Sequence, residues 1–291
     1  MGNSITLYGS IGCIFLRTTT IEYPKYIFIL SDNHSKLPYC KNYIMISKWL
    51  KNKSNINNIL LEEVPRNNVI LTELFSQSEH TQKLKDLFIQ NPKLIKGIDI
   101  RPLLIKFSWE LLSLYNNNNH VKKMGNITLN SYLENVNTFF NFTNKNIMEL
   151  NENYNENNIN QSYYGIQFKI IKNLYIEYKS KYNIYINYRL INIYNYFIHI
   201  LEEFNFILDN IMEFYTIMCI FKINNNGKNV IIHTGLLHAE KIVFWLEKAY
   251  LYETMYKKGI TDIETAENNP IQHGCLHLSK ILDDALSRNN T

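Results

Sequence analysis

The segment from Tyr26 to His34, with the sequence YIFILSDNH, decides the expected fold. Its first five residues are apolar on both faces, which is typical of an interior strand in a sheet that helices cover on both sides. Its last four residues are polar and typical of a turn. A buried strand is therefore expected to end here and to carry an acid, Asp32, and His34 out at its carboxyl end.

Further apolar runs extend this pattern along the chain. Runs at residues 11–16, 59–64 and 230–232 predict strands, and residues 97–102 predict a short strand that a proline ends. Helices are expected at residues 43–51, 73–90, 164–221 (as two or three helices) and 239–258, the last with a C-terminal cap at Gly259. This order of strands and helices predicts an α/β fold with a mostly parallel central sheet flanked by helices.

The chain is expected to form a single α/β domain over residues 1–291. An Asn-rich stretch at residues 115–163 predicts an insertion within that domain, with one helix at residues 131–150. Asn, Ile, Lys and Tyr are encoded by AT-rich codons, so this bias reflects genome composition more than function.

Composition excludes some classes of protein. Of the 291 residues, 46% are hydrophobic and 19% are charged, which excludes a globally disordered chain. The net charge of +4 comes from 30 Lys and Arg against 26 Asp and Glu, spread along the sequence without a basic run. A nucleic-acid partner is not expected, because such proteins concentrate positive charge on one face.

The cysteines predict an intracellular protein. Cys13, Cys40, Cys219 and Cys275 form no C-x-x-C pair, and the N-terminus has no secretory signal. Isolated cysteines of this kind are expected to be reduced, buried thiols. For a viral protein, the expected compartment is the host cytoplasm or the virion.

Two features bear on membrane association. The most apolar stretch, residues 204–221, contains Asp209 and Glu213, so it is expected to be a buried helix and not a transmembrane span. The sequence MGNSIT at residues 1–6 fits the pattern for N-myristoylation of Gly2. A single acyl chain gives only weak, reversible membrane association.

Each predicted strand ends in residues that carry chemistry. In chain order, the four strand ends supply Asp32 and His34, then Glu62, Glu63 and Arg66, then Asp99 and Arg101, and finally His233 and His238. The carboxyl ends of parallel strands meet at one edge of a sheet, where α/β proteins bind ligands. We therefore expect these side chains to lie together.

The residue types predict roles at this edge. Catalysis by proton transfer is expected from Asp32, His34, Glu63 and His238. Substrate binding is expected from Arg66, Arg101, Asp99 and His233, with Arg66 or Arg101 binding an acidic group or an oxyanion. The set His34, Glu63 and His238 also offers ligands for a divalent metal such as zinc or manganese, which would activate a water molecule.

Structural explanations compete at each position. Asp32 is also a common helix or turn cap, Glu63 and Arg66 are also a plausible solvated pair, and Asp99 with Arg101 is also a plausible structural ion pair. Asp209 and Glu213 share one helix face, directed either to the site or to water. The other histidines are expected to be incidental: His80, His120, His199, His273 and His277. Cys275 lies between two of them, but the spacing matches no structural zinc motif. Cys40 is a weak candidate nucleophile, because no histidine adjoins it.

These motifs resemble those of the TIKI/TraB, ChaN-like and erythromycin-esterase superfamily. Residues 26–34 are similar to its opening strand followed by G-E-x-H or G-x-x-H, and LLEEVPR at residues 60–66 is similar to its second strand, which ends in Glu. GIDIR at residues 97–101 resembles an Asp-x-Arg element, and GLLH at residues 235–238 resembles the closing G-x-x-H motif. The resemblance implies an α/β fold with His and Glu along one edge of the sheet.

The sequence departs from that superfamily at its first motif. Ser31 and Asp32 stand where the superfamily commonly has Gly and Glu, so the carboxylate reaches one methylene group less. The divergent motifs and AT-rich codons look like those of a large DNA virus. Superfamily activities include metal-dependent proteolysis, macrolide lactone hydrolysis and haem binding, so the fold does not select one of them.

Three functions stay open. The first is a hydrolase, with or without a metal, that acts on a small molecule or peptide. The second is a non-catalytic viral structural or host-interaction protein on the same fold. The third is a calcineurin-like metallophosphoesterase, whose D-x-H motif matches Asp32–His34 but whose G-D-x-x-D and G-N-H-[DE] motifs are absent from the sequence. The oligomeric state is not predicted.

Overall fold

A computed structural model describes residues 4–19, 25–34, 37–65, 78–105, 126–140, 159–222, 229–269, 271 and 273–287. The chain divides into two compact units. The first unit comprises Met1–Asn67, Phe75–Asp99 and Tyr215–Thr291, and the second comprises Asn68–Leu74 and Ile100–Phe214.

A six-stranded sheet forms the centre of the first unit. Its order is β6 (Ile95–Gly97), β5 (Asn58–Leu61), β7 (Val230–Gly235), β3 (Tyr26–Asp32), β2 (Gly12–Thr18) and β8 (Tyr252–Gly259). The pairs from β6 to β3 are parallel, and β2 pairs antiparallel with both β3 and β8. The predicted mostly parallel sheet is confirmed. β3, which contains the apolar run at residues 27–30, lies inside it.

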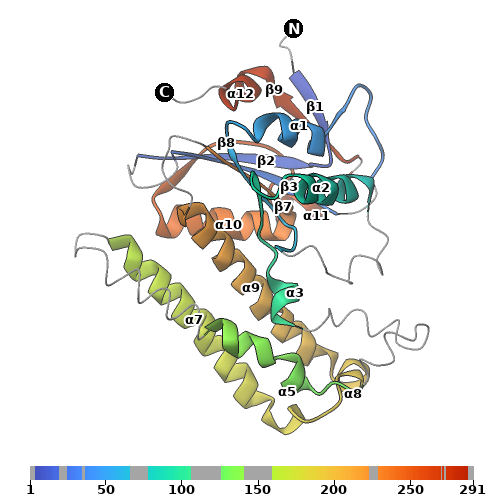
Figure 1. Cartoon of the computed structure of the whole chain (residues 1–291), viewed down its shortest axis with the longest axis vertical. Coiled ribbons are helices and arrows are strands. Elements are labelled where there is room, and N and C mark those ends of the chain that lie inside the picture. The colour runs from blue at the N-terminus through green and yellow to red at the C-terminus, as the bar shows by residue number, and fades with distance from the viewer. Residues whose placement is uncertain are drawn as a thin grey trace. The chain divides into compact units, whose positions relative to one another are not determined.

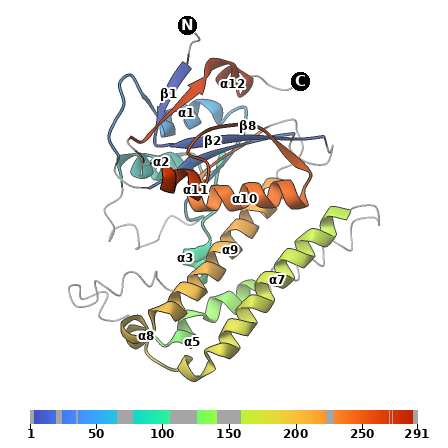
Figure 2. The same cartoon turned by 180° about the vertical axis from the view of Figure 1, so that it is seen from behind.

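Helices cover both faces of this sheet. On one face, a single buried core joins five strands of this sheet to α1 (Ile46–Lys53) and α2 (Glu79–Gln90), through Cys13, Phe28, Leu30, Ile59, Ile95, Ile231, Trp49, Leu50, Leu84 and Leu87. α10 (Leu236–Ala249) contacts β3, β7 and β8, and Figures 1 and 2 show it on the side of the strands opposite to α1. Successive residues of a strand point to opposite faces of the sheet. Because helices pack on both faces, every position of an interior strand is buried and is expected to be apolar.

A small second sheet completes the first unit. Its order is β4 (Ile44–Met45), β1 (Ser4–Tyr8) and β9 (Cys275–Ser279), with β1 parallel to β4 and antiparallel to β9. α12 (Lys280–Ala285) follows β9, and its Asp283 accepts a hydrogen bond from the Trp49 indole (2.8 Å) and pairs with Lys53 Nζ (2.6 Å). This sheet is not among the predictions from the sequence, because β1 pairs with strands that are distant from it in the chain, at residues 44–45 and 275–279.

The helix predicted at residues 239–258 is wrong in its second half. α10 ends at Ala249, and β8 pairs antiparallel with β2. Leu251 has a left-handed φ of 58°, which turns the chain between helix and strand. Gly259 also has a positive φ, of 76°, but it ends a strand and caps no helix. Helical periodicity continued by chance into YETMYKK, whose aromatic residues instead pack in the sheet.

The short strand predicted at residues 97–102 is wrong in its position, and Pro102 lies in a helix. β6 spans Ile95–Gly97, and α3 (Arg101–Leu104) follows with the proline in its first turn. Proline suits this place because its missing N–H would have no partner there in any case. α11 (Ile263–Asn268) is a further short helix, capped by Asp262, whose side chain accepts from Thr265 N at 2.7 Å.

The second unit is helical where the structure describes it. Its elements are α3, α5 (Leu129–Tyr132), the helical residues 134–140, α7 (Ile159–Lys181), η3 (Asn183–Tyr185), α8 (Leu190–Tyr196) and α9 (Ile198–Lys222), which runs on into the first unit. Aromatic side chains form much of its core, with Phe140 5.3 Å from Tyr175 and 5.6 Å from Phe168 between ring centroids. Most of residues 115–163 lie outside the described residues, so the predicted insertion stays a prediction.

One helix among the described residues, α9, is long and apolar enough to cross a membrane by length and composition alone. Most of its apolar segment is buried within the protein, as in the core helix of a soluble protein. Its Asp209 pairs with Arg101 at 2.7 Å, and Glu213 is fully buried. The expectation of a buried helix is therefore supported, while the intracellular compartment stays a prediction.

Candidate functional site

The candidate site lies at the carboxyl ends of three neighbouring strands, β3, β7 and β5. α1 and α2, which follow β3 and β5 along the chain, share one core on one face, whereas α10, which follows β7, covers the other. In α/β sheets, ligands commonly bind where the connections that leave adjacent strands turn to opposite faces. Asp32 ends β3, Glu62 follows β5, and Gly235 ends β7, so all three strands deliver polar groups there.

His34 lies between two carboxylates at this edge. Its Nδ1 is 3.0 Å from Asp32 Oδ2, and its Nε2 is 3.2 Å from Glu62 Oε2. The side chains of Asp32 and Glu62 are only 1% and 8% exposed, whereas that of His34 is 44% exposed. The structure therefore brings Asp32, His34 and the β5 acid together, as the sequence predicts for this edge.

Glu62 is the centre of a second set of contacts. Its Oε2 accepts hydrogen bonds from the Thr234 hydroxyl (2.7 Å) and the Gly235 backbone N–H (2.6 Å). Its Oε1 lies 3.6 Å from His238 Nε2, in the first turn of α10. A Cβ at Gly235 would lie 2.9 Å from His34 Nε2, so glycine allows the imidazole to approach the end of β7.

The structure corrects the choice between two adjacent acids. Glu62, and not the predicted Glu63, contacts His34 and His238. Consecutive residues leaving a strand point in opposite directions, so only one of the pair can face the histidines. Desolvation raises the pKa of Glu63 to about 7. The negative charge of Asp99 also raises this pKa, and the positive charge of Lys85 lowers it.

His80, which is expected from the sequence to be incidental, is part of the site. It lies in the first turn of α2, and its Nε2 is 2.7 Å from Asp32 Oδ2, the oxygen that His34 also contacts. The side chains of His80 and Asp32 are 2% and 1% exposed. No local sequence pattern predicts the contact between His80 and Asp32, because His80 lies 48 positions after Asp32 in the chain.

The site fixes the charges of its members. Desolvation disfavours ionised Asp32, but hydrogen bonds with His34 and His80 prevail and hold the pKa of its carboxyl below the usual value. Desolvation likewise opposes protonation of His34, yet Glu62 and Asp32 raise the pKa of its imidazole well above the ordinary value. His34 also has a left-handed φ of 54°, a conformation that costs energy in a non-glycine residue and is frequent at functional sites.

The predicted substrate-binding residues have different surroundings. His233 is fully inside the sheet, where its Nε2 lies 2.6 Å from the carbonyl oxygen of Gly9, and burial lowers the pKa of its imidazole. It therefore supports the fold and does not face a substrate. Asp99 donates its backbone N–H to the Glu63 carbonyl at 3.2 Å, and Arg101 belongs to the second unit, where it pairs with Asp209. Arg66 and Gly2 lie outside the described residues.

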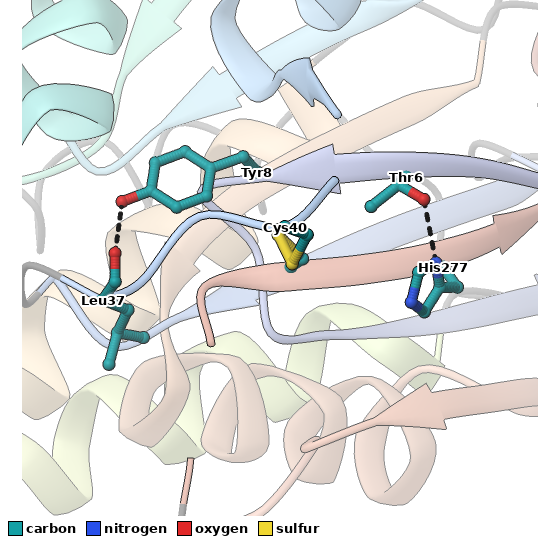
Figure 3. The surroundings of a disulfide bond; sticks show 6 residues. Thr6, Tyr8, Leu37, Cys40 and His277 are labelled. Carbon is teal, nitrogen blue, oxygen red and sulfur yellow. Dashed lines mark hydrogen bonds between the residues drawn. A yellow bond between two sulfur atoms is a disulfide. The ribbon is translucent and has the colours of Figure 1, made fainter. Parts of the chain in front are cut away.

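The cysteine prediction is wrong for two of the four residues. Cys40 and Cys275 form a disulfide, with their sequence positions 235 apart (Figure 3), while Cys13 and Cys219 are free and buried as expected. Disulfides are favoured in oxidising compartments, so the cysteines no longer support an intracellular location. Together with His273, the two bonded cysteines form a group of potential metal ligands within 4.8 Å of one another.

No family model, curated protein or solved structure matches this chain. The resemblance to the TIKI/TraB, ChaN-like and erythromycin-esterase superfamily therefore stays a prediction from its short motifs.

Proposed function

We propose that this chain is a hydrolase that activates water with an acid–base centre formed by His34, Glu62 and His238. The observation that carries the proposal is the position of His34, whose exposed ring has both nitrogens within 3.2 Å of buried carboxylates. A purely structural ion pair gains nothing from an exposed imidazole in a costly backbone conformation. Asp32 holds the ring through Nδ1, and proton transfer to a substrate would take place at Nε2, where the substrate group takes the position of Glu62.

The contacts divide the roles among the residues. Asp32 orients the His34 ring through Nδ1, as the carboxylate does in hydrolase triads. Glu62 and Asp32 raise the pKa of His34, which favours its protonated form, and in that form it donates a proton to the leaving group. Glu62 and His238 are 3.6 Å apart, a spacing at which one water molecule can contact both, and this pair accepts the proton of the attacking water.

The substrate class is an ester or amide of a small molecule or peptide. Both bonds are cleaved by attack of water with protonation of the leaving group, the two steps that this set of residues provides. The resemblance to the superfamily supports the same class, because lactone and peptide hydrolysis are among its activities.

A more specific form of this proposal is a hydrolase that depends on a divalent metal. Imidazole nitrogens and a carboxylate are the ligands of catalytic zinc sites. His34, Glu62 and His238 are the residues that would supply them, with Glu62 in place of Glu63, and His34 would first have to lose a proton and its contact with one carboxylate. The potential ligands that the described residues already bring together are instead Cys40, His273 and Cys275. A bound metal would lower the pKa of water. Assays of chelator-treated protein, with zinc or manganese then restored, distinguish a metal-dependent from a metal-independent centre.

The test compares two adjacent acids. Glu62→Gln and Glu63→Gln are to be assayed with chromogenic ester, amide and phosphate-ester substrates, and their folding is compared by circular dichroism. We expect Glu62→Gln to lose about 100-fold or more in kcat/KM, the usual contribution of general acid–base catalysis, and Glu63→Gln to retain activity.

Equal activity of Glu62→Gln and wild type would refute the proposed centre. A wild-type protein inactive on every substrate class, with and without added metal, would favour the non-catalytic alternative. Metal-dependent activity confined to phosphate esters would favour the metallophosphoesterase.

A further inference from the structure

We propose that reduction of the Cys40–Cys275 disulfide creates a zinc site formed by both cysteines and His273. One ligand atom of each of the three residues lies within 4.8 Å of the others. Thiolate sulfur and imidazole nitrogen are the ligands that zinc prefers, and three protein ligands leave a fourth position for water. This inference is independent of the proposed hydrolase activity.

The main chain holds the two cysteine segments together without the disulfide. Gly274 N donates to the Pro38 carbonyl at 3.2 Å, and Gly9 N donates to the Gly274 carbonyl at 2.8 Å. The Tyr8 hydroxyl donates to the Leu37 carbonyl at 2.8 Å, as Figure 3 shows. Because Cys40 and Cys275 lie next to these anchored residues, their thiols stay close after reduction and form a preorganised pair.

Strand pairing fixes the other side of the site. Cys275 begins β9, opposite Tyr8 of β1, and the Thr6 hydroxyl is 2.9 Å from His277 Nδ1 further along the same pair of strands (Figure 3). His273 precedes β9 by two residues and is exposed, so its imidazole is accessible to a metal from solvent. Cys275 is buried and Cys40 half-buried, which limits exchange of a bound ion.

The chemistry balances in two steps. A cellular dithiol, or a tertiary phosphine in the laboratory, supplies two electrons to the S–S bond, and each sulfur takes up one proton. The dithiol becomes a disulfide, and the phosphine becomes a phosphine oxide with oxygen from water. Zinc then binds both sulfurs as thiolates and the neutral His273 ring, and two protons are released.

The remaining cysteines provide the control. Burial raises the pKa of the Cys13 thiol to about 12 and also raises that of Cys219, which disfavours the thiolate that a metal needs. Cys13→Ala therefore removes one thiol without touching the proposed site.

The experiment titrates cobalt(II) into full-length protein, because thiolate-bound cobalt has a near-ultraviolet charge-transfer band that reports sulfur ligands alone. We expect the band to saturate at one equivalent in phosphine-reduced wild type and Cys13→Ala, and to disappear when zinc is added. Oxidised wild type and Cys40→Ser should lack this one-equivalent band. Loss of a residue that merely supports a ligand costs roughly 10- to 100-fold in metal affinity, so His273→Ala should lose at least that much.

Three results would overturn the proposal: no band in reduced wild type, a band of equal strength in Cys40→Ser, or unchanged affinity in His273→Ala. His273 is exposed, so His273→Ala is expected to fold as wild type does, and a change in its cobalt affinity then reports the loss of a ligand.

Discussion

Asp32 Oδ2 contacts two imidazoles with different exposures, the buried His80 and the exposed His34. The buried ring anchors the carboxylate in the protein, and the carboxylate in turn holds the exposed ring at the edge of the site. Asp32 Oδ1 accepts the Asn33 backbone N–H at 2.7 Å, so both oxygens of this buried acid are satisfied.

Removal of His80 tests that anchoring role. His80→Ala should lower the free energy of unfolding by about 1–3 kcal/mol, because a buried carboxylate loses a hydrogen-bond donor. Urea denaturation measures this change, with Lys83→Ala, an exposed position on the same helix, as control. A double-mutant cycle with Asp32→Asn separates the coupling between the two groups from the cavity left by the ring. Zero coupling would contradict the assigned contact.

The raised pKa of His34 predicts how its contribution to stability depends on pH. A histidine whose folded-state pKa exceeds its unfolded value of about 6.5 stabilises fully below that pH, and the contribution is lost as pH rises through the folded-state pKa. The gap in unfolding free energy between wild type and His34→Gln should therefore be widest at about pH 5–6 and narrow on the alkaline side. Urea titrations at stepped pH values measure the gap. A gap that widens with rising pH would show that the His34 pKa is not raised.

At the level of elements, β8 depends on two residues with left-handed backbone. A Cβ at Gly259 would lie 2.2 Å from the Ile11 carbonyl oxygen, and its φ is positive. Leu251, at the other end, has a positive φ although it carries a side chain, and that side chain is 65% exposed.

Opposite effects on stability are expected at the two ends of β8. Gly259→Ala should cost about 1–3 kcal/mol or more from backbone strain and the clash with Ile11. Leu251→Gly should stabilise by up to about 1 kcal/mol, because glycine adopts this φ freely and little apolar surface is lost. Thermal and urea denaturation measure both, and effects of the same sign would contradict this description of the strand.

At the level of the whole molecule, the Cys40–Cys275 disulfide joins the beginning and the end of the first unit, across 235 sequence positions. A crosslink that closes so long a loop restricts the unfolded chain strongly. The double variant Cys40→Ser/Cys275→Ser should therefore lose about 2–5 kcal/mol of unfolding free energy.

Urea denaturation without reductant measures that loss. Wild type treated with phosphine should lose a similar amount, whereas the double variant should not respond to phosphine. A wild-type protein insensitive to reductant would contradict a stabilising role for the bond.

The sequence by itself determined the interior strands, their order with the helices, and the polar residues at their ends. These features are local, since an apolar run or a turn is encoded by neighbouring residues and the physical preferences of each type. The mostly parallel sheet and the meeting of Asp32 with His34 at its edge follow from that information. The helix predicted across β8 shows the limit of periodicity, because pairing with β2 outweighed the helical pattern.

Only the tertiary structure decided which distant groups meet. The choice of Glu62 over Glu63 depends on the register of β5, where a shift of one residue turns every side chain to the other face. The contact of His80 with Asp32 and the bond between Cys40 and Cys275 join residues that are distant in the sequence and that only the tertiary fold brings together. A local sequence pattern does not predict such long-range contacts, because burial and packing in the complete fold determine them.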